Sequence, residues 1–149
     1  MIESVSSELY DELGVQFPNA EIDGFGRIYR NRKREVGLVP EFRIGKEYRD
    51  VYLDDRRDGL YAFITSETSE TDDEFIFSNE VKIIFFLNLD TFYSQYLDEQ
   101  AHRDIISILR KISYRRFTVT GVETGIENVF NGFDTEGIKF SDLAPYHLF

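Results

Sequence analysis

Apolar residues recur every three or four positions in two stretches of the chain, which is the spacing of one face of an α-helix. The first stretch predicts a helix over residues 2–13, with Gly14 as its C-terminal stop. The second predicts a helix over residues 98–113, with Asp98 as its N-cap and basic residues in its last turn. The apolar stripe of this second helix comprises Ala101, Ile105, Ile108, Leu109 and Ile112.

Between the two helices the pattern is that of strands and turns. Residues 15–26 contain several Gly and Pro breakers and predict a loop. Residues 27–66 predict strands joined by turns, with Pro40 at a strand edge or turn and residues 47–66 paired as a hairpin with a longer loop. The clearest strand covers residues 81–90 and is apolar on both faces near its middle, which indicates burial on both sides or an interface on one.

Two further strands are expected near the C-terminus. Residues 116–122 are rich in β-branched side chains and predict a strand, and residues 143–149 predict a short terminal strand or an arm. The order of helix, strands, helix and strands predicts one α+β domain over residues 1–149. We expect an antiparallel or mixed β-sheet with two main helices packed largely on one face.

Charge changes this picture because it is unevenly distributed over a chain whose net charge is −11. The acidic stretch from 67 to 80 contains no basic residue and carries Glu67, Glu70, Asp72, Asp73, Glu74 and Glu80. Residues 65–74 have no apolar periodicity and predict a surface loop or a long, mobile hairpin arm. The basic residues gather in two runs, the first formed by Arg27, Arg30, Arg32, Lys33 and Arg34, the second by Arg110, Lys111, Arg115 and Arg116. Opposite charges on one chain suit a protein that meets copies of itself or other proteins. The net negative charge disfavours nucleic-acid binding over the whole surface.

The first basic run also carries an aromatic residue. On a strand, Arg27 and Tyr29 face one way while Arg30 and Arg32 face the other, so the charge is split between two faces. This pattern predicts an exposed edge strand protected by charge, or a docking surface for an acidic neighbour. The chain has 9 Tyr, a residue enriched in interfaces, which favours subunit contacts.

Candidate chemistry is sparse. The absence of cysteine excludes disulfides, thiolate metal sites and cysteine nucleophiles. Of the two histidines, His102 follows Asp98 by one helical turn on the second helix, and His147 favours a structural role in strand packing. The acids at 72–74 do not have the spacing of an EF-hand loop and predict a solvated loop. We therefore expect no catalytic residue, no cofactor and no metal site, and no membrane segment or signal peptide.

The chain resembles the small tail terminator and tail completion proteins of tailed bacteriophages. The resemblance lies in the order of elements and in loose motifs spread over most of the chain. These are the short opening helix, the segments Glu47–Tyr52 and Gly59–Ile64, the apolar strand Val81–Leu89, the helical segment Asp104–Leu109 and the terminal segment Ser141–Phe149.

The resemblance implies a virion structural protein, not an enzyme, assembled in the host cytoplasm. Such proteins form a ring, usually of six subunits, that terminates the tail tube at the head–tail junction and links it to the neck. The implied partners are other copies of the chain, a tail tube protein and neck or connector proteins, with genome DNA only in passage. A lumen-facing or axial acidic loop is then expected from Glu67, Glu70, Asp72, Asp73 and Glu74. A subunit or partner interface is expected from Arg27, Arg30, Arg32, Lys33, Arg34, Arg115 and Arg116.

Other functions remain open. A neck or head-completion adaptor of a tailed phage would use the same features with another ring number. A small acidic regulator that mimics DNA charge predicts a monomer or dimer whose acids line one face. A hydrolase with paired carboxylates predicts a deep cleft holding two acids with perturbed pKa values, and is disfavoured.

Overall fold

The computed structural model describes residues 2–32, 37–50, 58–65, 70–73, 76–78, 80–93, 97–113, 117–136 and 146–149. The helices in this part of the chain are α1 (Ile2–Gln16), α2 (Leu89–Phe92), α3 (Asp98–Ser113) and α4 (Ile126–Val129). The strands are β1 (Ile22–Arg32), β2 (Leu38–Ile44), β3 (Glu47–Asp50), β4 (Gly59–Thr65), β5 (Glu70–Asp73), β6 (Ile76–Ser78), β7 (Val81–Asn88) and β8 (Tyr146–Leu148).

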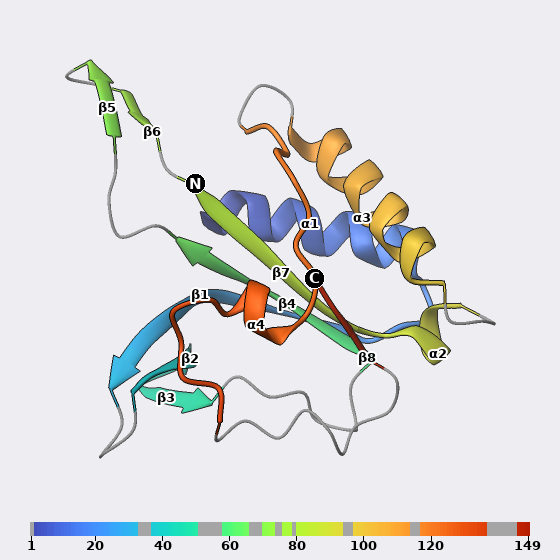
Figure 1. Cartoon of the computed structure of the whole chain (residues 1–149). Coiled ribbons are helices and arrows are strands. Elements are labelled where there is room, and N and C mark those ends of the chain that lie inside the picture. The colour runs from blue at the N-terminus through green and yellow to red at the C-terminus, as the bar shows by residue number, and fades with distance from the viewer. Residues whose placement is uncertain are drawn as a thin grey trace.

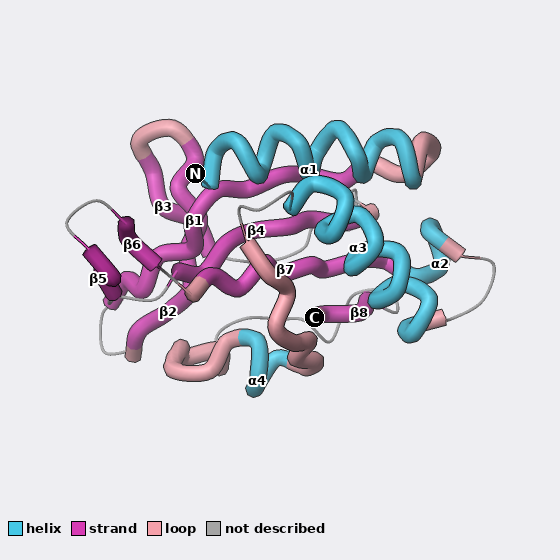
Figure 2. Tube along the Cα trace, turned by 90° about the horizontal axis from the view of Figure 1, so that it is seen from above, coloured by secondary structure: helices cyan, strands magenta, loops and turns pink. Residues whose placement is uncertain are grey.

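Six of the strands form one mixed sheet in the order β3-β2-β1-β4-β7-β8, while β5 and β6 form a separate hairpin (Figure 1). Only the β1–β4 pair is parallel among the described pairings. The two long helices, α1 and α3, lie together on one face of the sheet, and the short α4 lies on the other (Figure 2). The predicted α+β class, with a mixed sheet and two main helices on one face, is confirmed.

Burial is concentrated in the two central strands. β4 is buried at six of its seven positions, and β7 is buried from Ile84 to Leu87. Tyr61, Phe63, Phe85 and Leu87 pack against α1 and α3, whereas their alternate neighbours pack toward α4. Of the two predictions for this strand, burial of its middle on both sides is confirmed for Ile84–Leu87, because each face of the sheet there is covered by its own cluster.

The helix predicted over residues 98–113 is confirmed with its bounds, and all five residues of its stripe are buried. Asp98 is the first residue of α3, so it begins the helix and is not its cap. β8 confirms the short terminal strand, since Leu87 pairs with His147 and Phe86 with Leu148.

The predicted end of the first helix is wrong. α1 continues past Gly14 to Gln16, and the Phe17 amide donates to the Leu13 carbonyl at 2.8 Å. Leu13 and Phe17 both pack in the helix-side cluster. Burial of two large side chains contributes about 1.5–3 kcal/mol each, which exceeds the roughly 1 kcal/mol cost of a glycine within the helix.

The loop predicted over residues 15–26 is also wrong beyond Glu21, because β1 begins at Ile22. Gly24 lies opposite Tyr61 in the parallel pair, and a Cβ at this position would stand 2.4 Å from the Tyr61 hydroxyl oxygen. The glycine therefore makes room for a buried ring and does not end the strand. The pairing is irregular between Gly24 and Arg27.

The hairpin predicted within residues 47–66 does not form. β3 pairs with β2 through the turn at Gly45, whose φ is 63°, and β4 lies between β1 and β7. β4 is apolar on both faces and gains more burial at the centre of the sheet than at its edge. Pro40, expected at a strand edge or turn, is fully buried within β2, one residue before the described β2–β3 ladder begins at Glu41.

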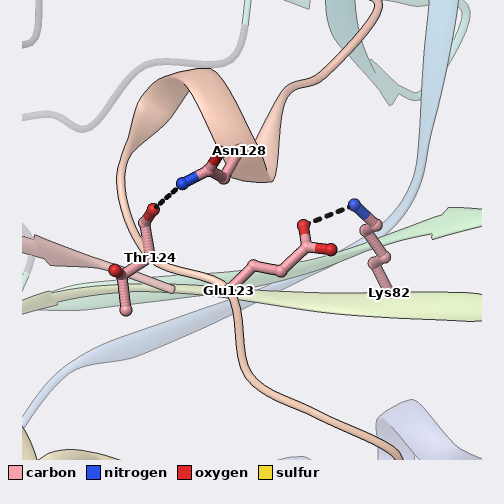
Figure 3. A network of polar contacts seen from close by, with 4 residues as sticks. All are labelled: Lys82, Glu123, Thr124 and Asn128. Carbon is pink, nitrogen blue, oxygen red and sulfur yellow. Dashed lines mark hydrogen bonds and ion pairs between the residues drawn. The ribbon is translucent and has the colours of Figure 1, made fainter.

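Two other strand predictions need correction. β7 ends at Asn88, whose side-chain oxygen accepts from the Asp90 amide at 3.1 Å and starts α2, so Leu89 is helical. Within the predicted strand 116–122, residues 117–122 have no regular structure. Phe117 and Val119 pack alternately against the helix-side cluster, which explains the strand-like pattern. The segment crosses the edge of the sheet instead of pairing along it (Figure 3).

Candidate subunit interface

The described part of the acidic stretch forms an arm, which we define as residues 70–73 and 76–78. Its described core is the antiparallel pair β5–β6, in which Glu70 lies opposite Ser78 and Thr71 opposite Phe77. The arm extends away from the sheet and both long helices (Figure 1). Among the described elements, β5 and β6 contact each other extensively and no other helix or strand to a similar degree. A two-stranded hairpin is marginally stable by itself in water, so an arm of this kind gains stability from a docking partner.

The opposite charge gathers in a basic lobe, which we define as residues 27–50. This stretch carries eight basic and four acidic side chains in a chain whose net charge is −11. In the structure it comprises the second half of β1 with β2 and β3, a three-stranded antiparallel extension of the sheet. In Figure 1 the lobe lies at the lower left, beyond the helix layer, and the arm projects at the upper left.

One face of the basic lobe presents two tyrosines and two arginines, which we call the tyrosine–arginine face. The Tyr29 and Tyr48 rings meet edge to face at 5.3 Å between centroids, and the Arg27 guanidinium lies 5.6 Å from the Tyr29 centroid. Arg43 is the cross-strand neighbour of Tyr48, and its Nε donates to the Gly45 carbonyl at 3.1 Å. Tyr48 is 48% exposed, so this face is available for contact.

Among the described side chains of this face, the one acid, Glu41, is buried. Glu41 is 5% exposed and accepts a hydrogen bond from the Asn31 side-chain nitrogen at 2.7 Å. In the β2–β3 register Glu41 pairs with Asp50. Tyrosine and arginine are the residue types that contribute most often to the centres of protein interfaces. The arrangement is suited to binding an acidic protein segment.

The other arginines of the first basic run have other places. Arg30 faces the opposite side of the sheet, where its guanidinium lies 4.7 Å from the centroid of Phe133 and close to Gly132. Arg32 lies opposite Leu38 on that same side and is exposed. The predicted split of the charge between two faces is therefore confirmed for the described arginines.

The remaining predicted interface residues, Lys33, Arg34, Arg115 and Arg116, lie outside the described residues, as do Glu67 and Glu74 of the predicted acidic loop. Glu70, Asp72 and Asp73 belong to strand β5, which agrees with the predicted hairpin arm and not with the predicted loop. The structure thus brings Arg27 together with Tyr29, and it adds Arg43 and Tyr48, which the sequence alone did not single out. Alternation within β2 and β3 could have placed them on one face, but only the register joins that face to Arg27.

Polar groups within the helix layer serve the fold. The Tyr61 hydroxyl donates to the Ser6 carbonyl at 2.8 Å and lies 3.3 Å from the Ser6 hydroxyl. Burial raises the pKa of Tyr61, although the hydrogen bond with the Ser6 side chain opposes this shift. The Tyr93 hydroxyl donates to Asp104 at 2.8 Å, and the Gln100 side chain donates to the other Asp104 oxygen at 2.7 Å. Burial, followed by the Asp104 carboxylate, raises the pKa of Tyr93 well above its ordinary value.

Other kinds of site find little support in the described part of the chain. His102 lies on α3 with its ring 4.6 Å from the terminal Phe149 ring. No group of three or more metal-ligating side chains gathers among the described residues. None of the described helices is long and apolar enough to cross a membrane.

Comparison of the chain with models of known protein families, with characterised proteins and with solved structures finds no match.

Proposed function

We propose that the chain is a non-enzymatic structural subunit that assembles with copies of itself head to tail. The observation that carries this proposal is that one chain has two surfaces of opposite charge. One is the acidic arm that extends away from the body, and the other is the basic lobe with its exposed tyrosine–arginine face. Two different surfaces that complement each other produce a heterologous contact, and such contacts close into rings when the rotation between subunits permits.

With the resemblance added, the assembly is a ring at the head–tail junction of a tailed bacteriophage, which terminates the tail tube and meets the neck. The arm then docks on the tyrosine–arginine face of the neighbouring subunit. An axial or lumen-facing role for the same acids, which would repel the phosphates of passing DNA, is the second candidate. The hairpin form of the arm favours the docking role, because a free hairpin gains stability from contact.

Charge reversal tests the docking role. One variant reverses the arm (Glu70→Lys, Asp72→Lys, Asp73→Lys), the other reverses the face (Arg27→Glu, Arg43→Glu), and Arg110→Glu on the exposed side of α3 is the control. Light scattering and negative-stain microscopy over a range of concentrations should show closed rings for the natural chain and the control. Each reversed variant alone should remain a monomer, and an equimolar mixture of the two should assemble again, because the reversed charges complement each other.

The outcomes separate the candidate functions. Rings that persist in the arm variant, together with altered DNA passage, would support the lumen role and exclude the docking role. A natural chain that is monomeric at every concentration would contradict self-assembly and favour the acidic DNA-mimic regulator. The mass of the intact assembly distinguishes a hexameric terminator from an adaptor of another ring number.

A further inference from the structure

Along the edge of β7 beyond β8, the described part of the chain provides no backbone partner. β4 pairs with β7 from Val81 to Leu87, whereas β8 covers only Phe86–Asn88 on the other side. One further residue is joined there, because Phe85 and Phe149 exchange two backbone hydrogen bonds of 2.8 and 3.0 Å. In an antiparallel ladder alternate residues direct both groups to the same neighbour, so Ile83 and Val81 point to the side of Phe149. No other described residue makes a backbone hydrogen bond to them on that side.

A pocket lies along this same stretch, which we call the edge pocket. Its volume is about 220 Å³, and its walls come from residues 80–85, from Ile105, Ile106 and Leu109 of α3, and from residues 119–123. The lining is mainly apolar, and the charged groups stand at its rim. There the Lys82 ammonium and the Glu123 carboxylate form an ion pair of 2.6 Å (Figure 3).

The segment that carries Glu123 forms the outer wall of the edge pocket. Figure 3 shows it crossing the strands just past the end of β8. The Gly125 amide donates to the Leu148 carbonyl at 3.1 Å, and the Asn128 side chain donates to the Thr124 carbonyl at 2.9 Å, so this segment is fixed at its α4 end. The ion pair between Glu123 and Lys82 joins this segment to β7.

The chemistry of this edge selects one kind of occupant. Drug-sized ligands occupy pockets of roughly 300–1,000 Å³, so a pocket of about 220 Å³ is suited to one large apolar side chain. An apolar small molecule leaves the amides and carbonyls of Val81 and Ile83 without hydrogen bonds. An extended peptide can insert one apolar side chain into the pocket and also form hydrogen bonds with these backbone groups. β8 and Phe149 pair with the adjoining part of β7 in the same way.

We infer that the free edge of β7 binds an extended segment of a partner protein, which adds as a strand beside Val81 and Ile83 and inserts one apolar side chain into the edge pocket. The inserted side chain lies against Ile105, Ile106 and Leu109, in the way that Phe149 packs in the helix-side cluster. This site does not depend on the arm or on the tyrosine–arginine face, and it stands if the proposed ring does not.

Amide hydrogen exchange by NMR tests the premise in the free chain. The Val81 and Ile83 amides should exchange at least about a hundredfold faster than those of Lys82 and Ile84, which point to β4. Equal protection of all four amides contradicts the inference, since the edge is then already occupied. Protection of Val81 and Ile83 that appears only at high chain concentration would identify a second copy as occupant and overturn the partner assignment.

Binding is tested with a phage-displayed library of random peptides selected on the full chain. Selected peptides should have alternating apolar residues, and a synthetic copy of one should slow exchange of the Val81 and Ile83 amides at least about tenfold. Ile106→Trp, which fills the pocket from α3, should weaken this peptide at least about tenfold, whereas Ser107→Trp at the neighbouring exposed position should not.

Val119→Trp fills the pocket from the opposite wall and replaces Ile106→Trp in this test if the latter unfolds the chain. Peptides that bind equally to the filled and natural pockets, or a selection that yields no binder sensitive to filling, would overturn the inference. The charge-reversed arm variant should bind the peptide as the natural chain does, which separates this site from the proposed subunit contact.

Discussion

Strands β4 and β2 have the same length, seven residues, yet they present different surfaces. β4 lies between two covered strands and is buried at every position from Gly59 to Ile64. β2 lies in the basic lobe, where Val39, Pro40 and Glu41 at its centre are buried. Leu38 at one end is 41% exposed, and Arg43 near the other end is exposed. The long helix α1 contacts β1, and neither long helix contacts β2 or β3 to a similar degree among the described elements, so the sheet exposes more side chains on the lobe side of β1 than at its centre.

This difference separates stability from recognition. Each large side chain of β4 and β7 that is buried contributes about 1.5–3 kcal/mol to folding, whereas an exposed side chain of the lobe contributes much less. Changes in the lobe can therefore alter binding without unfolding the chain, and changes in the centre cannot. The contrast can be tested by substitutions on the two sides.

The largest effect is expected from Phe85→Ala. Phe85 is 1% exposed and contacts the rings of Tyr61 and Phe149, so its loss leaves a cavity at the centre of the helix-side cluster. We expect the free energy of unfolding to fall by about 3–5 kcal/mol, measured by urea denaturation. The matched lobe substitution, Tyr48→Ala, should cost about 1 kcal/mol or less, the value of one exposed aromatic pair. Similar losses of unfolding free energy for both variants would contradict the division between a stabilising centre and an exposed lobe.

A smaller effect is expected within β1, where the covered and uncovered parts of the sheet meet. Gly24→Ala places a Cβ 2.4 Å from the Tyr61 hydroxyl and 2.6 Å from its ring carbon, so the buried ring must move. We expect a loss of about 1–3 kcal/mol in thermal or urea unfolding. Gly26→Ala has open space within 4 Å and should be neutral or slightly stabilising. If Gly26→Ala lowers the free energy of unfolding more than Gly24→Ala does, the covered part of the sheet does not end between these two positions of β1.

The sequence predicted the parts of this fold that depend on local pattern. The helix at 98–113 is defined by its own stripe, so its bounds agree with α3. Gly24 looked like a loop residue because the sequence does not show that Tyr61 packs across it. β4 lies between β1 and β7 because burial there is favoured over pairing with the preceding strand. A hairpin rule considers only strands that are consecutive in the sequence, so it cannot predict this position.

The candidate interface shows the same limit. The acidic stretch and the first basic run are visible in the sequence because each is continuous. The tyrosine–arginine face is not continuous, since it joins β1 to β2 and β3 through register. The edge pocket joins β7, α3 and the segment after α3, and its apolar residues have the same pattern as core residues. They differ from core residues in one respect, that no described residue pairs with the adjoining edge of β7.

The smallest effect concerns a polar contact at the rim of the covered region, where Tyr93 donates to Asp104. Removing one hydrogen bond of this kind costs about 0.5–1.5 kcal/mol, so Tyr93→Phe should lower the free energy of unfolding by about 1 kcal/mol at neutral pH. Asp104 keeps its hydrogen bond from Gln100, which limits the loss.

The contact also has a pH dependence whose direction follows from the raised pKa of Tyr93. In the unfolded chain a tyrosine loses its proton near pH 10, while folded Tyr93 keeps its proton to higher pH. Above about pH 10 the folded state therefore binds more protons than the unfolded state, so stability is complete below this pH and falls as pH rises. Urea unfolding between pH 8 and about 11 should show a shallower decline for Tyr93→Phe than for the natural chain. Asp104→Asn should flatten the decline only in part, because burial, the larger cause, remains. If stability falls with pH at the same slope in all three chains, Tyr93 titrates in the folded state as it does in the unfolded one. Its surroundings would then be as exposed to solvent as the surface of the lobe.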